Sequence, residues 1–413
     1  MRVTVVLRAN NLGNQFKFYW LTQARRKIRE DGTRAALEAK GIHAVNPKEF
    51  LTPAYPKRVL EAPIPPKLEE TFATPPPVIR DTPCHVFTHR FSPIGGLAQA
   101  QLITNSLTRT TLPQTIADYA ATGDGDASDI NERVKEAILH AHLLDTFQER
   151  LPRIHDAINN PGWVFPIEYG IPLCRKHKTL TYQLLLLLDQ VESCGLERQL
   201  VEDTSTAVML NHGDRLMQLM HDAAYLVSSP RPLPPMASPE EVRAASESEG
   251  MPDLYPMSPF INCRARTSYS EEERYGVTSS QLHPHTVFIH HNQPYMPHQE
   301  DTFTGMSLLY AFSHAAAYAK LIRKDPIGDL DEPITVQVVH INRQRYHFGV
   351  FQLNTLNLNP ATSDAAPTTT RNLFWTQPWE TLFDTCKFKV GKPVLEGYNP
   401  KVFSLLRGLH VQG

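Results

Sequence analysis

The sequence is poor in cysteine and contains no long hydrophobic run. Only five of its 413 residues are cysteine, an odd number, and no two of them form a Cys-x-x-Cys pair. We therefore expect no framework of disulfides, and we expect the protein to reside in a reducing compartment. The leucine run at residues 184–188 is five residues long, whereas about 20 apolar residues are needed to cross a bilayer. We therefore expect a soluble protein that is not a small disulfide-stapled domain.

Acidic residues are absent from the first 29 positions, and this makes the charge distribution uneven. Residues 1–60 carry twelve Lys or Arg and four Asp or Glu, a formal charge of +8. The remaining chain carries 29 basic and 39 acidic residues, a formal charge of −10. A basic head on an acidic body predicts an arm that meets a polyanion, while the body meets proteins or solvent.

The acid-free start also has the composition of a mitochondrial presequence, since basic residues alternate there with apolar and aromatic ones. It contains few serines, and it has no uninterrupted apolar core of the secretory kind. The alternative is an ordinary basic N-terminal arm, and the two interpretations are compatible. We expect a mitochondrial transit segment.

The motifs of the common enzyme families are missing. The sequence has no G-x-x-x-x-G-K-[ST], no G-x-G-x-x-G and no G-x-S-x-G. Its 18 histidines are densest at five positions: His283, His285, His290, His291 and His298. Neither an H-E-x-x-H helix nor a carboxylate-rich motif accompanies them, so polar edge or surface histidines are favoured over a metal site. We expect no catalytic residue, no metal and no cofactor.

Proline-rich stretches divide the chain into four expected regions. Residues 1–83 form a basic arm and an extended segment, because nine prolines between positions 51 and 83 exclude regular helix and central strand. That segment holds too many apolar residues for a solvated linker, so we expect it to pack on a surface. Residues 84–227 are expected as a mostly helical lobe with short strands, 228–259 as a proline-rich linker, and 260–413 as an α+β lobe.

Hydrophobic periodicity and capping residues predict the elements of an α+β fold. Helices are expected at 95–108, 179–194, 239–249 and 302–322. Two more are expected to begin at capping residues, one at the capping box of Asp129 and Glu132 and one at Asn399 and Pro400. Strands are expected at 84–91, 204–210, 285–290, 334–341 and 346–356. Residues 216–227 suit either a strand or a helix. The body is a mixed globular fold whose C-terminal sheet contains a buried hairpin with covering helices, and an extended N-terminal arm precedes it.

The hairpin at 334–356 is the clearest element of the sequence. The apolar alternation changes parity within both strands, so each strand is apolar on both faces, as in a sheet covered from two sides, or carries a bulge. The helix at 302–322 is the expected cover on one side. The final helix or a partner protein covers the other. The turn residues Arg343 and Arg345 are expected to be exposed.

Clustered basic residues with interleaved aromatics are typical of RNA binding. The first thirty residues hold such a pattern, with the aromatic stretch 16–20 followed by the basic stretch 25–29. A solvated basic helix whose aromatic side chains pack on the body is the alternative. The candidate RNA contacts are Arg2, Arg8, Lys17, Arg25, Arg26, Lys27, Arg29, Arg34, Arg343 and Arg345.

Several segments, taken in order, resemble the family of the mitochondrial large-ribosomal-subunit protein numbered thirty-seven. The closest are residues 346–359 (YHFGVFQLNTLNLN) and 371–375 (RNLFW). Further similarity lies at 84–91, 140–144, 255–261 and 284–289. A homologous sister family, formerly assigned to the small subunit and numbered thirty, shares the Gln-Leu-Asn-Thr stretch. The segments at 84–91 and 140–144 favour the family of protein thirty-seven over the sister family.

The resemblance implies a structural component of the mitochondrial large subunit, in the matrix, that supports mitochondrial translation. Its implied partners are the large-subunit rRNA, met at the periphery, and other mitochondrial ribosomal proteins, above all the homologous sister as a heterodimer. Neither a membrane nor a small-molecule substrate is implied. The alternatives are a hydrolase-type enzyme with a site in the C-terminal lobe, near residues 283–298, and a free-standing proline-rich adaptor.

Replacing Arg25, Arg26, Lys27 and Arg29 with Ala should weaken incorporation into the large subunit, because contacts between cations and phosphates are lost. The difference from the unchanged chain should depend on salt concentration, since phosphate contacts are salt-sensitive. Sedimentation of tagged variants over a series of salt concentrations measures it. Incorporation that is unchanged at every salt concentration would contradict the assignment.

Overall fold

The computed structural model describes residues 32–45, 78–122, 127–151, 168–192, 197–254, 258–277, 279–291, 299–323, 328–358 and 370–412. The chain divides into two compact units, Met1–Thr74 and Pro75–Gly413. The described part of the first unit contains helix α2 (Thr33–Glu38), which buries no residue. Most of the basic arm and most of the proline-rich segment lie outside the described residues, and the predictions for them stay predictions.

The second unit is built on one mixed sheet of eleven strands. Its main order is β2 (Ser106–Arg109), β12 (Asn372–Thr376), β11 (Arg345–Thr355), β10 (Asp329–Asn342), β9 (His283–His291), β6 (Arg215–Ser229), β1 (Val78–Thr88) and β7 (Ala265–Tyr269). Off this path, β5 (Gln199–His212) pairs with β6 and with β8 (Arg274–Tyr275), and β13 (Glu380–Thr381) pairs with β11. Two small ribbons are separate: β3 (Glu149–Arg150) with β4 (Tyr169–Gly170), and β14 (Thr385–Lys389) with β15 (Lys392–Glu396).

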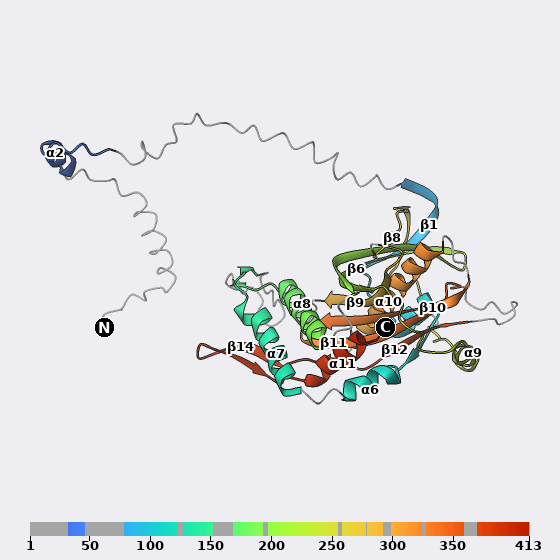
Figure 1. Cartoon of the computed structure of the whole chain (residues 1–413). Coiled ribbons are helices and arrows are strands. Elements are labelled where there is room, and N and C mark those ends of the chain that lie inside the picture. Colours follow the sequence, from blue (N-terminus) through green and yellow to red (C-terminus); the bar gives the residue numbers. More distant parts are fainter. Residues whose placement is uncertain are drawn as a thin grey trace, which may run out of the picture. The chain divides into compact units, whose positions relative to one another are not determined.

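The helices of this unit come from both halves of the chain (Figure 1). They are α5 (Gly96–Thr104), α6 (Gln114–Thr122), α7 (Ala127–Leu139) with a π-helical turn at His140–Leu144, α8 (Leu173–Val191), α9 (Pro239–Ser248), α10 (Glu300–Ile322) and α11 (Pro400–His410). Helix α10 connects β9 to β10, and these strands run parallel, so the helix serves as the crossover that a parallel pair requires.

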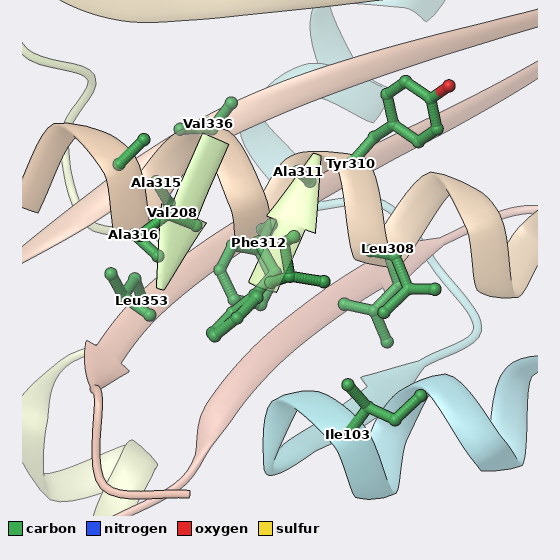
Figure 2. Packing of buried hydrophobic residues seen from close by; sticks show 14 of the residues in the cluster. Ile103, Val208, Leu308, Tyr310, Ala311, Phe312, Ala315, Ala316, Val336 and Leu353 are labelled. Carbon is green, nitrogen blue, oxygen red and sulfur yellow. The ribbon is translucent and has the colours of Figure 1, made fainter. Parts of the chain in front are cut away.

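One face of the sheet is covered by α10, which is buried along almost its whole length. Its alanines and Phe312 pack on Val336 of β10 and Leu353 of β11, while Leu308 meets Ile103 of α5 (Figure 2). Phe312 and Phe351 make an edge-to-face contact with ring centroids 5.9 Å apart. Helices α10 and α5 also approach closely: a Cβ on Gly305 would stand 2.7 Å from the carbonyl oxygen of Gly96, so only glycine fits there.

The opposite face is covered by α7, α8 and α11. A second core cluster joins these helices to the central strands. From the strands it contains Val339, Ile341, Phe348 and Val350; from α8 and α11 it contains Leu184, Leu185, Leu188, Val402, Leu405 and Leu406. The same two central strands therefore contribute apolar residues to both cores of the molecule.

The hairpin prediction is confirmed. Strands β10 and β11 pair antiparallel in continuous register from Ile334–Leu353 to Asn342–Arg345, with a shift only before Ile334. The change of parity therefore reflects two covered faces rather than a bulge. Phe348 and Phe351 are both fully buried, and the final helix supplies the second cover from within the chain.

Other predicted elements are confirmed with shifted ends, except that the helix expected at 95–108 ends at Thr104 and residues 106–109 form strand β2. The ambiguous segment 216–227 is strand β6, and Asn399 caps α11 by accepting a hydrogen bond from the backbone N–H of Lys401. The prediction of a capping box at Asp129 is wrong, since α7 begins at Ala127. A capping box is found at α9, between Ser238 and Glu241.

The expected separation into two lobes is corrected by the sheet. Strand β6 precedes the proline-rich segment 228–259 and β9 follows it, yet the two strands pair antiparallel at the centre of the sheet. The region 84–227 also holds two long strands, β5 and β6, rather than short ones. Residues Pro75–Gly413 form one compact unit, because the pairing of distant strands joins what the local composition divides.

Replacing Phe351 with Ala should lower the free energy of unfolding by about 3–5 kcal/mol, because a fully buried ring is lost and a cavity remains. Chemical denaturation of the purified chain measures this change. Phe388→Ala is the matched control, since this ring is 52% exposed and its loss should cost far less. Equal losses for the two variants would contradict the buried-hairpin assignment.

Candidate functional site

The candidate RNA contacts fall into two groups. Seven of them lie outside the described residues: Arg2, Arg8, Lys17, Arg25, Arg26, Lys27 and Arg29. Arg34 lies on α2 and is exposed, with Glu38 one turn further along the helix at 3.6 Å. Arg343 and Arg345 lie at the tip of the central hairpin, where the structure separates their roles.

Arg343 is exposed, as predicted. It stands in the two-residue turn between β10 and β11 with φ 57°, and this left-handed conformation turns the chain tightly enough to close the hairpin. No hydrogen bond or ion pair of its guanidinium is found in the described part of the chain. Its charge therefore faces solvent without a compensating carboxylate.

Arg345 is different, and its predicted exposure is wrong. Its side chain is 19% exposed and forms an ion pair with Glu300, the first residue of α10. The guanidinium also lies over the Trp379 ring, 5.9 Å from its centroid. Arg345 is thus a structural residue that joins the hairpin to the start of α10, because the strand direction brings it beside an acidic first turn.

A second uncompensated cation lies near Arg343, in the first turn of α8. Burial lowers the pKa of Lys176, and its ammonium group makes no hydrogen bond or ion pair within the described ranges. Both cations act on His177, which is 1% exposed: burial first, and then the neighbouring His142, Lys176 and Arg343, lower its pKa to about 4. Arg175 and Lys178, in contrast, are paired with Asp145 and Asp203. We call Lys176 and Arg343 the hairpin-tip cations.

The ribbon β14–β15 carries a third basic group that sequence reasoning missed. Lys387, Lys389 and Lys392 are all exposed. The sequence does hold a signal for this group. Lysines alternate with Phe388 before the Val-Gly pair at 390–391, and another lysine follows the pair, which indicates a tight hairpin with one basic face.

The histidine-rich segment proposed for an enzyme site is used for packing. His283 pairs with the Tyr318 hydroxyl, and His285 with the carbonyl oxygen of Gln412. His290 bonds Thr181, and His291 bonds His340 at 2.5 Å. His298 lies outside the described residues.

A Ser–His network continues inward from this segment. His340 Nδ1 and His347 Nδ1 lie 2.9 and 3.1 Å from the hydroxyl oxygen of Ser307, and His347 Nε2 lies 2.6 Å from the hydroxyl oxygen of Thr376. Ser307, His340 and His347 are all 0% exposed. A substrate cannot reach them in this conformation, so the network satisfies buried polar groups between α10 and the sheet.

In the described ranges, no group of three or more His, Cys, Asp or Glu side chains is arranged to hold a metal ion. Nor does any helix among those residues have the length and apolar character to span a bilayer.

Comparison with known proteins defines the class. The sequence model of the family described as "Mitochondrial 28S ribosomal protein S30 (PDCD9)" matches residues 206–411, from β5 to the end of α11. This range contains the central hairpin, α10 and α11. Over this range the chain is similar to a family of mitochondrial ribosomal proteins.

Three individual relatives share one protein name, and the similarity to them extends over most of the chain. The chain is 25% identical over 352 residues to the "Large ribosomal subunit protein mL37" of Rattus norvegicus, covering 82% of this chain and 77% of the relative. It is 26% identical over 349 residues to the protein of the same name from Gallus gallus, covering 82% and 76%. The Bos taurus protein is 24% identical over 353 residues.

The buried histidines predict that stability falls with acid. Burial lowers the pKa of nine of them to about 3 or 4: His142, His177, His221, His285, His290, His291, His314, His347 and His410. Unfolded histidine has a pKa of about 6.5, so below that pH the unfolded chain binds more protons than the folded one. Stability is therefore complete above about pH 6.5 and decreases as the pH falls toward 4, by up to about 1 kcal/mol per pH unit for each histidine.

Urea denaturation between pH 7.5 and 5 should show midpoints that fall steeply with pH. His221→Leu should flatten this dependence by removing one buried titrating group, whereas His140→Gln, at an exposed position, should leave it unchanged. A midpoint that is constant, or rises, as the pH falls would contradict the neutral buried state of these side chains.

Proposed function

We propose that this chain is a structural protein of the large subunit of the mitochondrial ribosome, located in the matrix, that supports mitochondrial translation. The observation that carries the proposal is the similarity to proteins named for the large subunit, which extends over 82% of the chain. The family model is named instead for a 28S, small-subunit protein and matches only residues 206–411. We follow the relatives because their similarity covers more of the chain.

A structural role without catalysis is consistent with the interior. The Ser–His network is sealed inside the core, and the histidines of β9 are bonded to neighbouring elements. This arrangement gives no support to a hydrolase site at residues 283–298. Nothing in the described structure favours a free-standing adaptor either.

The proposed partners are the large-subunit rRNA and neighbouring ribosomal proteins. The basic arm and the hairpin-tip cations are the proposed rRNA contacts, because uncompensated cations bind phosphate. A heterodimer with the homologous sister protein is part of the proposal. It follows from the family resemblance, and the match of this chain to both names supports only the homology of the two proteins.

Sedimentation of the endogenous protein in high salt tests the proposal. The chain should co-purify with the mitochondrial large subunit at one copy per particle. Migration as a free protein, or with the small subunit, would overturn it.

The two arginines at the hairpin tip separate RNA contact from folding in the same assay. Arg343→Gln should leave the thermal midpoint of the free chain unchanged and lower the salt concentration at which the chain leaves the particle. Arg345→Gln should lower the thermal midpoint, since it removes the ion pair with Glu300 and the contact with Trp379, together worth about 1–2 kcal/mol. Equal behaviour of the two variants would refute the assigned division of roles.

A further inference from the structure

The ribbon β14–β15 concentrates positive charge on one face. Its register places Lys389 directly opposite Lys392, and Lys387 lies two residues before Lys389 on the same face. Like charges directly opposite each other destabilise an antiparallel pair. Glu396 pairs with Lys389, but neither Lys387 nor Lys392 has an ion pair in the described part of the chain. Glu396 offsets part of this charge, and the three lysines together leave the face with a net positive charge.

The tip of the ribbon is unfavourable in a second way. The turn is Val390-Gly391, with φ values of 49° and 74°, so both residues are left-handed. Such turns favour Asn-Gly, because a β-branched side chain is strained at positive φ. Val390 is nevertheless fully exposed, so packing within the chain does not compensate for the strain. Backbone strain of this kind clusters at active sites and ligand-binding positions.

The other face of the ribbon is apolar beyond the edge of the core. Cys386 and Leu395 pack against the core cluster that contains α8 and α11, and this contact anchors the base. Further out, Phe388 is opposite Pro393, and the ring is 52% exposed. The ribbon therefore projects from the body, at the left edge of the folded unit in Figure 1, with lysines on one face and an aromatic ring on the other.

We propose that this ribbon tip, residues 387–392, inserts into folded RNA, with its lysines on backbone phosphates and Phe388 stacked on an unpaired base. The stretch from Lys387 to Leu395 contains no acidic residue, so its charge is complementary to a polyanion. Phosphates would relieve the repulsion between Lys389 and Lys392, and an exposed ring is the usual platform for a splayed base. The inference rests on the proposed function, and it identifies a contact that the N-terminal arm does not provide.

Photocross-linking in intact particles tests the inference. Phe388 is replaced by p-benzoylphenylalanine in the full-length chain, particles are assembled in mitochondria, and the cross-linked partner is identified after irradiation. A cross-link to large-subunit rRNA is the expected result. Cross-links only to proteins, or none, in particles that still contain the chain would overturn the ribbon assignment while the proposed function stands. A chain that never enters the large subunit would overturn both.

Matched variants separate charge from folding. Combining Lys387→Gln, Lys389→Gln and Lys392→Gln should lower the salt concentration at which the chain is released from RNA. The slope of log affinity against log salt should become smaller by about two. The control combines Arg231→Gln, Arg243→Gln and Arg264→Gln, three exposed cations on other elements, and should change neither quantity. Equal effects of the two triple variants would refute a specific role for the ribbon.

Val390→Asn provides the last distinction. Asparagine suits the left-handed turn, so the thermal midpoint should stay equal or rise. The RNA cross-link from Phe388 should nevertheless become several-fold weaker, because the exposed methyl groups of Val390 are lost from the contact. An unchanged cross-link yield would show that Val390 has no part in binding and would refute the inserted tip.

Discussion

The burial of the β10–β11 hairpin on both faces is the constraint on which the rest of the structure depends. Phe351 and Leu353 face α10, while Phe348 and Val350 face α8 and α11. A strand with apolar side chains on two faces must be covered twice, so the chain has to bring helices to both sides of the same sheet. The alanines of α10 and the glycine contact with α5 are consequences on one side; the leucines of α8 are consequences on the other.

The polar groups of the interior follow from the same constraint. Ser307, His340 and His347 are enclosed between α10 and the sheet, where each side-chain polar group needs a partner within the protein. Their mutual hydrogen bonds supply those partners. Burial lowers the pKa of both imidazoles and keeps them neutral, which makes the fold sensitive to acid. The charge proposed to meet RNA lies at the surface: in the described residues it is carried by the hairpin-tip cations and the ribbon, and the basic N-terminal arm is the further proposed contact.

Local patterns in the sequence predict the central hairpin, α10 and the capped start of α11, because their periodicity and capping residues lie within short stretches. The structure confirms the α+β class, and the comparisons with known proteins confirm the family resemblance. The pairing of β6 with β9 is not predictable from such patterns, since residues 230–282 lie between them and the proline-rich first part of this stretch suggests a boundary. The role of Arg345 is hidden for the same reason: its partner Glu300 is 45 positions away. The lysines of the ribbon become significant only when the register places them opposite each other.

Hydrogen exchange of the free chain and of the chain within the large subunit tests the central claim most directly. If helices of this chain cover both faces of the hairpin, the amides of β10 and β11 exchange only through global unfolding. They are then among the slowest amides of the free chain already, and assembly slows them only as far as it stabilises the whole fold. The amides of β14 and β15 should exchange rapidly in the free chain and gain protection in the particle. Rapid exchange of β10 and β11 in the free chain, slowed only by assembly, would contradict the account, because the cover would then come from a partner.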